Sequence, residues 1–565
     1  MPTYEYCTRL IQPIHASVRG SETSICDQFV HLIVDTKAIL IGLDGLGWDV
    51  LEPGLETGRL PTLAALREEG MDADLESTHP PWTPCAWPSL LSGRNPGAHG
   101  LFDFFTRDGY EKRLADRRDV DAPYLPDVAA AEGRSVVSIN FPVTHPIPVY
   151  EDGAVVPGYL APEDARFYPE GIREEYEREH GGYTIYPEYD AEENAVDGYV
   201  DVARGRRDMA RFLDERFDWD LLAVQFQVTD SVFHDLDDPE ERLEVLSAVD
   251  GFVSDIVDLG EDPTVLVVSD HGMGDYHWTF YVNTWLAEHG YSETTEGETE
   301  YFRTKKSELR GEDDADGSAV ATLLGRGMSA ASKVGLTPNR VHTTLSAVGL
   351  AGIVERLLPE SALVSAQSRT VDWERSDAFQ IFFNSLGVHL NWAGREPAGT
   401  LSNSEYEALR EELIAELERV RDPDGNVVFD EVKRKEAVYD GPHLDDAPDL
   451  LLYPRDYDYD VSGSILGPFR RYEHQNHRPD GILVAAGPGV TDATVDRASI
   501  LDVAPTLAAL LDVPLDEDRD GSVLPFCEPP SEEAPWRSLA HIDYGSSEVT
   551  DSDVEERLAD LGYME

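Results

Sequence analysis

The sequence predicts an α/β protein with a mostly parallel central sheet that helices cover on both faces. Short, nearly continuous apolar runs alternate with longer helical patterns along much of the chain. Such runs are typical of parallel strands buried on both faces, and their alternation with helices predicts a three-layer α/β/α arrangement. Ligands of such sheets gather outside the carboxyl ends of the strands, so residues at those ends are the first functional candidates.

The first predicted strand is Lys37-Ala-Ile-Leu-Ile-Gly-Leu-Asp44, an apolar run that ends in an acid and is followed by Gly45. A helix at 61–69 comes next, and a second helix opens near Thr83, where Thr-Pro precedes another apolar run. The alternation then continues. Helices are predicted at 127–132, 202–216, 241–257, 404–420 and 500–511, and strands at 135–141, 221–228, 264–270, 387–391, 447–453 and 481–488.

The alternation of predicted strands and helices also indicates how the chain is divided into segments. The alternation stops at 291–376, where charged patches, Gly and Ser surround helical patterns such as 344–358, so we expect an insertion that caps the site. The polar C-terminal end has one short helical pattern, at 554–561. The predicted organisation is an N-terminal extension (1–36), a core in two parts (37–290 and 377–515), the cap insertion (291–376) and an acidic tail (516–565).

The charge of the chain is far from balanced. Among 565 residues, 110 are Asp or Glu and 46 are Lys or Arg, which gives a formal net charge of −64, and only seven of the 46 are Lys. An even acidic surface that prefers Arg to Lys indicates a halophilic protein of a salt-rich cytoplasm, where screening shortens the range of charge repulsion to about 3 Å at 1 M salt. We therefore expect neither a nucleic acid polymer nor a membrane surface as a partner.

The cysteines and the hydropathy favour a soluble cytoplasmic protein. Cys7, Cys26, Cys85 and Cys527 are scattered without CxxC spacing, so neither a zinc knuckle nor a disulfide framework is predicted. No run of 18 apolar residues appears, and the N-terminal segment lacks a basic region followed by an apolar one.

The Thr83 helix is the first candidate site. A hydroxyl at the N-cap of a helix faces free backbone N–H groups and the positive end of the helix dipole. In that setting a phosphate or sulfate group is held beside Thr83 while the Thr83 hydroxyl attacks it. Most threonines before a proline are ordinary helix caps, so this stretch needs support from elsewhere in the chain.

Three predicted strand ends supply that support. They present Asp44, then Asp230 with His234, then Asp270 with His271. Asp230 and His234 are four residues apart, so on a short helix they share one face and bind one ion together. Carboxylates and imidazoles without thiolates suit Zn²⁺ first and Mn²⁺ second. A single acid at a strand end is usually a cap or turn former, and only the joint pattern favours metal binding.

A further pair of histidines occurs late in the chain, in the stretch Arg471-Tyr-Glu-His-Gln-Asn-His477-Arg-Pro-Asp-Gly481. This stretch precedes a predicted strand. Either His474 or His477 is available as one more metal ligand, and the spacing of residues alone does not choose between them.

The order of these motifs resembles the alkaline phosphatase superfamily. The shared features are Asp44, the Thr83 helix with its Ser92-Gly93 ending, Asp230-xxx-His234, Ser269-Asp270-His271-Gly272 and a late histidine. The resemblance covers roughly residues 37 to 515. Three segments look most like the branch of type I phosphodiesterases, nucleotide pyrophosphatases, phosphohydrolases and phosphomutases, namely Pro80-Pro-Trp-Thr-Pro, His99-Gly-Leu-Phe-Asp-Phe-Phe105 and Leu501-Asp-Val-Ala-Pro-Thr506.

The resemblance implies an alkaline-phosphatase-like fold and a two-metal hydrolase of phosphate esters, either a phosphodiesterase or a phosphatase, that acts on a small phosphorylated substrate. Thr83 would be the nucleophile and would form a phospho-threonine intermediate. One metal would lie among Asp44, Thr83, Asp270 and His271, and the other among Asp230, His234 and His477. His477 is preferred to His474 because it directly precedes the Arg-Pro-Asp-Gly run into the strand.

At two positions the chain departs from other branches of the superfamily, which argues against a sulfatase activity and weakens the case for a nucleotide substrate. Sulfatases of this superfamily carry a modifiable Cys or Ser at the place of Thr83 and an Arg four residues later, where this chain has Trp87. Nucleotide pyrophosphatases usually carry an Asn three residues after their Thr, where this chain has Ala86. A phosphomutase with the same metals and nucleophile, and a non-catalytic metal-binding or ligand-binding protein on the same fold, are the alternative functions.

Overall fold

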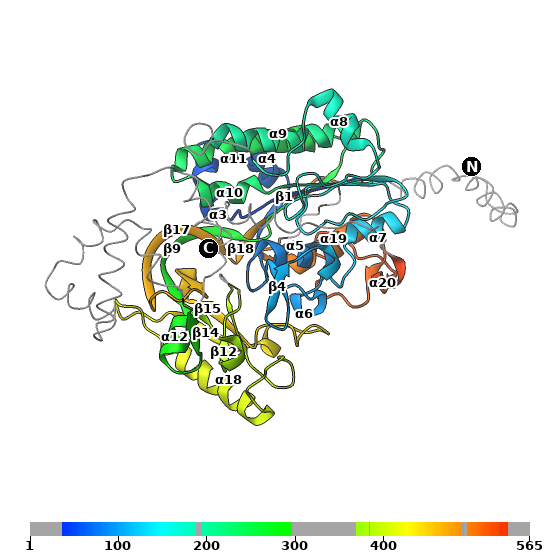
Figure 1. Ribbon diagram of the computed structural model, residues 1–565. Helices are drawn as coiled ribbons and strands as arrows, with labels where there is room; N and C mark the ends of the chain where they lie inside the picture. The colour runs from blue at the N-terminus through cyan, green and yellow to red at the C-terminus, as the bar shows by residue number, and fades with distance from the viewer. Residues whose placement is uncertain are drawn as a thin grey trace, which may run out of the picture.

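The computed structural model describes residues 37–187, 195–296, 369–382, 385–488, 490 and 494–540. The predicted N-terminal extension lies outside the described residues, as do the helical patterns at 344–358 and 554–561 and the cysteines Cys7 and Cys26. Figure 1 shows a three-layer body with a second, smaller lobe below it.

The centre of the body is an eight-stranded sheet in the order β19-β2-β18-β8-β1-β7-β5-β6. Only β18 runs against the other strands, because both of its pairings are antiparallel. The predicted mostly parallel sheet is therefore confirmed. Its strands are β1 (Ala38–Leu43), β2 (Met71–Glu76), β5 (Val136–Ile139), β6 (Gly153–Val156), β7 (Leu221–Phe226), β8 (Thr264–Val268), β18 (Asp480–Ala486) and β19 (Arg497–Ser499).

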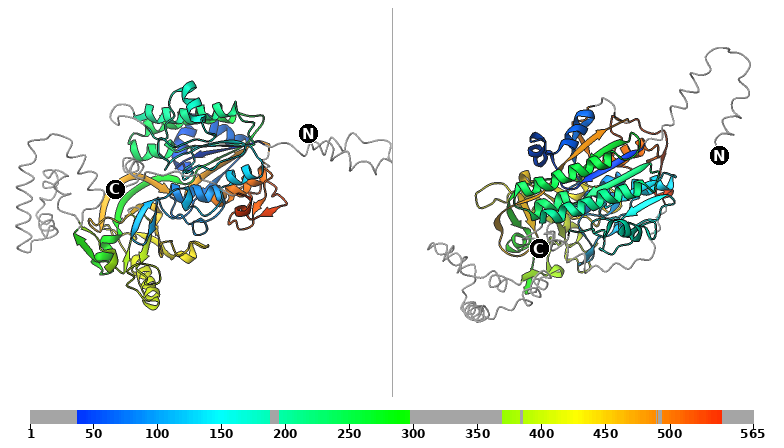
Figure 2. Two further views of the ribbon diagram at one scale, coloured as in Figure 1. Left: turned by 45° about the vertical axis from the view of Figure 1, so that its right-hand side comes forward. Right: turned by 90° about the horizontal axis from the view of Figure 1, so that it is seen from above.

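Helices cover both faces of this sheet (Figure 1). On one face the two long helices α9 and α11 lie side by side, as the view from above in Figure 2 shows. The helices of that face are α3 (Trp48–Glu56), α4 (Pro61–Glu69), α8 (Ile172–His180), α9 (Ala195–Asp214), α10 (Val228–Asp235) and α11 (Pro239–Val257). Those of the other face are α5 (Thr83–Ser92), α6 (Pro96–His99), α7 (Leu125–Ala131), α19 (Val503–Leu510) and α20 (Trp536–Leu539).

The strands predicted at 387–391 and 447–453 form, but in a second sheet. They are β13 (Gly387–Leu390) and β15 (Leu450–Pro454), which pair antiparallel in a four-stranded sheet of order β12-β13-β15-β14. An apolar run indicates a buried strand but does not say which strand it pairs with. With this sheet, the smaller lobe contains β12 (Ala378–Phe379), β14 (Phe429–Arg434), α12 (Val282–Glu288) and α18 (Asn403–Leu417).

A three-stranded sheet of order β16-β9-β17 joins the two lobes. Its central strand β9 (Gly272–Tyr281) begins immediately after Asp270 and His271, and it pairs antiparallel with β17 (Phe469–Arg478). The third strand is β16 (Tyr459–Ser462). The sequence did not predict β9 or β17, because β17 is polar and exposed or half-exposed at nearly every position, and β9 has Gly, Asp and His alongside its aromatic residues and lacks a continuous apolar run.

The shorter elements complete the described chain. Strand β10 (Thr294–Glu296) pairs with β11 (Arg369–Val371), so the predicted cap segment leaves and re-enters the body at one place. The predicted tail is described as far as residue 540, where Trp536 is buried against the body. The remaining strands are β3 (Phe105–Asp108), β4 (Glu111–Leu114), β20 (Leu515–Asp516) and β21 (Glu533–Ala534), and 3₁₀ helices lie at Arg117–Asp119, Trp373–Arg375, Lys435–Ala437, Arg455–Tyr457 and Ile500–Asp502.

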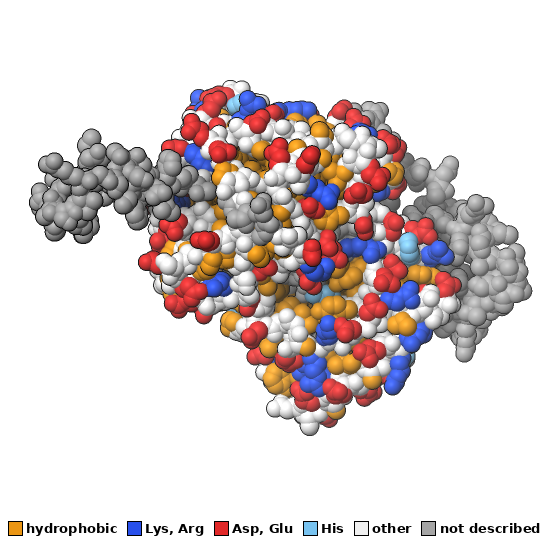
Figure 3. Space-filling model, turned by 180° about the vertical axis from the view of Figure 1, so that it is seen from behind, with side chains coloured by type: hydrophobic (Ala, Val, Ile, Leu, Met, Phe, Trp, Pro, Cys, Tyr) orange, Lys and Arg blue, Asp and Glu red, His pale blue; other side chains and the backbone are white. Residues whose placement is uncertain are grey.

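Acidic side chains are spread over the surface. Figure 3 shows them scattered across one whole face, with arginine and lysine side chains between them, rather than gathered in one patch. In the described parts of the chain, no helix combines the length and the apolar character that a membrane span requires.

Candidate active site

The predicted site residues meet at one edge of the central sheet. Asp44 directly follows β1, Asp230 lies in the first turn of α10 after β7, and Asp270 and His271 follow β8. Strands β8, β1 and β7 are neighbours and run parallel, so their carboxyl ends lie side by side. The edge of the sheet therefore brings together residues that are far apart in the sequence.

Two clusters of ligand-type side chains form there. In the first, His271 Nε2 lies 3.6 Å from Asp44 Oδ1 and 3.3 Å from Asp270 Oδ2. One ligand atom from each of the three residues lies within 4.8 Å of the others, and all three side chains are buried. We call this group the Asp44 cluster.

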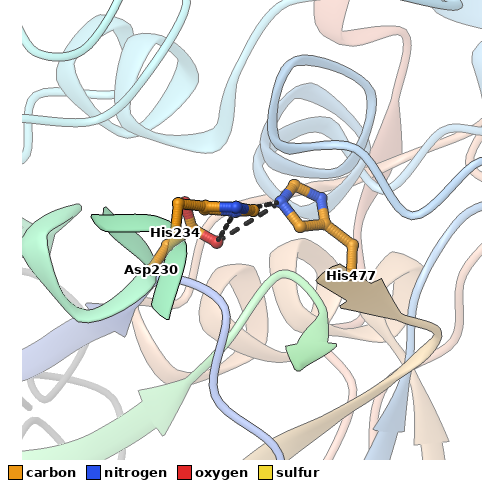
Figure 4. A group of neighbouring side chains, drawn as sticks. All are labelled: Asp230, His234 and His477. Carbon is orange, nitrogen blue, oxygen red and sulfur yellow. Dashed lines mark hydrogen bonds and ion pairs between the residues drawn. The ribbon is translucent and has the colours of Figure 1, made fainter. Parts of the chain in front are cut away.

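The second group, the Asp230 cluster, is drawn in Figure 4. His234 Nε2 and His477 Nε2 each lie 3.4 Å from Asp230 Oδ1, and the two nitrogens are 3.1 Å apart. Helix α10 presents Asp230 and His234 on one face, as their spacing predicts, and His477 reaches them from β17. The three side chains point toward one another.

The two clusters are adjacent. The rings of His271 and His477 stack with centroids 3.9 Å apart and an interplanar angle of 19°. Pairing of His477 with Met273 in the β9–β17 ladder brings this late histidine beside the strand end that carries His271. His474, the rival candidate, belongs to neither cluster, because its Nε2 lies 3.2 Å from Asp460 Oδ2.

Thr83 lies against the Asp44 cluster. Its hydroxyl donates to Asp44 Oδ1 at 3.4 Å and lies 3.3 Å from His271 Nε2, and the residue is 1% exposed. The expected N-cap is shifted by one residue, because the extended residue before the helix is Trp82 and Thr83 is the first helical residue. Thr83 still lies at the N-terminal end of α5.

Hydrogen bonds to the second ring nitrogen orient two of the histidines. His271 Nδ1 lies 3.0 Å from the carbonyl oxygen of Gly272, and His477 Nδ1 lies 3.1 Å from that of Pro81. A carbonyl oxygen only accepts, so each Nδ1 carries the proton and each Nε2 keeps its lone pair. Both lone pairs are therefore available to a metal, the arrangement found in metal-binding histidines.

The buried carboxyl groups of the site favour a bound cation. Burial, followed by the charges of neighbouring carboxylates, raises the pKa of Asp44 and of Asp270 well above the usual range. Burial alone would also raise the pKa of Asp230, but His234 and His477 lower it instead. Asp270 Oδ2 is buried and accepts no hydrogen bond from any described residue. A buried carboxylate oxygen of this kind is costly unless a positive charge faces it, so the residues fit divalent metal ions.

Burial and neighbouring charges also shift the pKa values of the three histidines. Burial lowers the pKa of His271 well below its usual value, and the neighbouring His477 lowers it further. Burial also lowers the pKa of His477. Burial would lower the pKa of His234 too, but the charge of Asp230 raises it above its usual value. Neutral imidazoles at His271 and His477 are the form that binds a metal.

Cys85 is not a competing nucleophile. It lies two residues after Thr83 in α5 and is fully buried. Burial raises the pKa of its thiol well above the usual value, with a smaller contribution from Asp103. A thiol in that state is a poor nucleophile, because the thiolate is the reactive form.

Sequence reasoning missed two side chains that hold Asp44. Trp87 Nε1 donates to Asp44 Oδ2 at 2.9 Å, and Gln225 Nε2 donates to the same oxygen at 2.7 Å. Gln225 is the next-to-last residue of the buried strand β7, where a polar residue in an apolar run is the only available signal. For Trp87 the sequence offers no signal beyond its place four residues after Thr83, where sulfatases have an arginine.

Comparison with known proteins shows the family of this chain. Residues 38–347, more than half of the chain, match the family of type I phosphodiesterases / nucleotide pyrophosphatases. The chain belongs to this family. As a type I phosphodiesterase / nucleotide pyrophosphatase family member, it is a hydrolase of phosphoesters, and the branch that the sequence motifs resemble is confirmed. No curated protein sequence matches the chain significantly.

One solved structure shares the fold of this family member, and two others superpose with lower scores. Phosphonoacetate hydrolase from Sinorhizobium meliloti 1021, in complex with phosphonoformate, superposes with a TM-score of 0.52 at 14% identity, covering 83% of this chain and 94% of that one. Murine ectonucleotide pyrophosphatase / phosphodiesterase 5 gives 0.44 at 12% identity, with 90% and 100% covered. Alkaline phosphatase PafA gives 0.47 at 11% identity, with 84% and 95% covered.

Proposed function

We propose that this chain is a metal-dependent phosphohydrolase that uses Thr83 as its nucleophile at a two-metal site. The observation that carries the proposal is the position of the Thr83 hydroxyl. It lies 3.4 Å from Asp44 Oδ1 and 3.3 Å from His271 Nε2, against the Asp44 cluster, and the ring of His271 stacks on that of His477 in the Asp230 cluster. A nucleophilic hydroxyl needs a setting that lowers its pKa and that holds the phosphoryl group, and an ion in the Asp44 cluster would supply both.

The Asp44 cluster and the Asp230 cluster would each hold one divalent ion. Six side chains supply the ligands, with the Thr83 oxygen as a further ligand of the first ion. Zn²⁺ is the expected ion and Mn²⁺ the alternative, because imidazole nitrogens and carboxylate oxygens suit both. When bound, the two ions neutralise charge on the phosphoryl oxygens and lower the pKa of groups beside them.

The residues of the chain perform the remaining steps. The Thr83 hydroxyl gives up its proton to water, and its oxygen forms a bond to phosphorus as the bond from phosphorus to the leaving oxygen breaks. The leaving oxygen takes up a proton from water and departs as the alcohol, and Thr83 carries the phosphoryl group. Water then attacks this phospho-threonine, restores the Thr83 hydroxyl and releases phosphate, or a phosphate monoester where the substrate was a diester. The positive end of α5 favours the anion beside Thr83 throughout.

The substrate is expected to be a small phosphorylated molecule. The net charge of −64 repels polyanions, whereas positive ions at the site would attract a phosphate locally. The acidic surface also supports the inference of a halophilic protein that works in a salt-rich cytoplasm. The family name favours a phosphodiester, and the same residues also serve a monoester.

The test is hydrolysis of paired chromogenic phosphate monoesters and diesters in molar salt with added Zn²⁺ or Mn²⁺. Wild type, Thr83→Ala and Thr83→Ser are compared, and the metal content of each is measured. We expect metal-dependent release that Thr83→Ala lowers by at least about a thousandfold and that Thr83→Ser partly retains. Both variants should keep their metal. Full activity of Thr83→Ala would exclude Thr83 as the nucleophile.

The same experiment separates the hydrolase from its alternatives. A phosphomutase would release no phosphate from either substrate but would carry a phosphoryl group on Thr83. A non-catalytic binding protein would bind metal without turnover and without phosphorylation of Thr83. Acid-stable phosphothreonine is detected by mass spectrometry, so each result is distinguishable.

A further inference from the structure

Asp44 uses its two carboxylate oxygens for different tasks. Oδ1 faces the hydroxyl of Thr83 and the ring of His271. Oδ2 instead receives Trp87 Nε1–H at 2.9 Å and Gln225 Nε2–H at 2.7 Å. Each of these side chains is fully buried, so no water competes for Oδ2. The two donors therefore fix which oxygen of Asp44 faces the site.

The orientation of the Gln225 amide follows from its other neighbour. Asn140 Nδ2 donates to the backbone carbonyl of Gln225 at 3.1 Å and to its Oε1 at 2.8 Å. A backbone carbonyl only accepts, so the NH₂ end of Asn140 must face it. Gln225 Oε1 then also faces that NH₂ group, and the Gln225 NH₂ group is left to face Asp44.

Local backbone features make room for this chain of hydrogen bonds. Asn140 has φ of 68°, a left-handed conformation that Asn tolerates better than most residues. Gly42 lies opposite Gln225 in the sheet, and a Cβ there would come within 2.5 Å of the Trp87 ring and 3.1 Å of Gln225 Cγ. A larger residue at 42 would displace both donors at once.

We propose that Gln225, together with Trp87, is a positioning residue for the nucleophile and for the metal of the Asp44 cluster. Both donors hold Asp44 Oδ2, so that only Oδ1 is presented to Thr83 and to the ion. The inference rests on the proposed function. Mutation of a residue that hydrogen-bonds to a metal ligand typically lowers metal affinity or activity by about 10-fold to 100-fold.

Gln225→Met and Trp87→Phe test the proposal, alone and together. Each single change leaves Oδ2 with one donor, and the double change leaves it with none. The matched control is Gln380→Met, because Gln380 is an equally buried glutamine whose amide donates to the Val461 carbonyl in the smaller lobe. Zn²⁺ affinity is measured on the metal-free proteins by competition with a chelator, and kcat and KM are measured on the Zn²⁺-saturated enzymes.

We expect each single variant to weaken Zn²⁺ binding at one of the two sites by about tenfold and to lower kcat with little change in KM. The double variant should lose more than the product of the single effects, because both donors act on one oxygen. Gln380→Met should keep both Zn²⁺ affinities. Where Gln225→Met does not fold, by circular dichroism and thermal unfolding, Trp87→Phe alone carries the comparison.

The proposal fails if the folded Gln225→Met and Trp87→Phe proteins match wild type in Zn²⁺ affinity and kcat, or if Gln380→Met shows the same losses. Those results leave the proposed function standing. A wild-type protein that binds no Zn²⁺ or Mn²⁺ would instead remove both the proposed function and the positioning role.

Discussion

The imidazole rings of His271 and His477 stack 3.9 Å apart, although one follows β8 and the other lies near the end of β17. This contact joins the Asp44 cluster to the Asp230 cluster. Two-metal hydrolases hold their ions about 3.5–4 Å apart so that both act on one phosphoryl group. The stacked histidines make the two clusters neighbours, as the proposed two-metal site requires.

The choice between the two late histidines is open to direct test. We expect His477→Gln to lose metal from the Asp230 cluster and to abolish turnover, because His477 Nε2 lies 3.4 Å from Asp230 Oδ1. His474→Gln should keep both metals, because His474 pairs with Asp460 instead. Metal analysis of the two purified variants is the measurement. Greater metal loss from His474→Gln than from His477→Gln would reverse the assignment.

Metal removal should destabilise the protein. Without ions, the site holds the carboxylates of Asp44, Asp230 and Asp270 in a buried space. A ligand that binds only the folded state at a hundred times its Kd adds about 2.7 kcal/mol. We expect EDTA to lower Tm and Zn²⁺ to restore it.

The matched variants for this measurement are Asp270→Asn and Asp218→Asn. Asp270→Asn should recover only part of the Tm increase on addition of Zn²⁺, because one cluster loses a ligand. Asp218→Asn should recover all of it, because Asp218 is an exposed residue that pairs with Lys37. An identical Zn²⁺ response in both variants would count against Asp270 as a ligand.

The buried carboxyl of Asp103, which belongs to neither candidate metal cluster, predicts a pH dependence of stability. Its carboxyl accepts the Phe104 N–H at 2.8 Å, and burial raises its pKa to about 7. The folded protein therefore holds this proton up to about pH 7, whereas an unfolded aspartate loses it near pH 4. Between these values the unfolded state binds fewer protons, so the contribution of Asp103 to stability falls as pH rises from about 4 to 7.

Asp103→Asn removes this titration and keeps the shape of the side chain. Relative to wild type, the variant should gain stability between pH 5 and pH 8, by about 3 kcal/mol at most, since each pKa unit corresponds to about 1.4 kcal/mol. Denaturant unfolding at the two pH values measures the difference. A difference that stays constant, or that shrinks as pH rises, would show that Asp103 is ionised throughout.

Salt should stabilise the protein strongly. A net charge of −64 and acidic side chains spread over the surface repel one another, and raising salt from 0.1 to 1 M shortens the screening length from about 10 to about 3 Å. We expect Tm to rise over this range in both NaCl and KCl, with no comparable rise in sorbitol of equal osmolality. A Tm that does not respond to salt would contradict the inferred adaptation to a salt-rich cytoplasm.

The sequence by itself determined the fold class and most of the site. The apolar run that ends at Asp44, the spacing of Asp230 and His234, and the Asp270-His271 pair are local patterns. A buried parallel strand is recognisable from its own residues, and its carboxyl end is then also known. For that reason the sequence alone predicts the first five candidate ligands and Thr83.

The tertiary structure decided what depends on pairing between distant strands. In the structure β13 and β15 belong to the second sheet, and β18 runs antiparallel to its neighbours. The β9–β17 ladder brings His477, rather than His474, to the site. The tertiary structure also places Gln225 and Trp87 on one oxygen of Asp44. These relations arise from non-local packing and hydrogen bonding, so a residue's own neighbours in the sequence do not contain them.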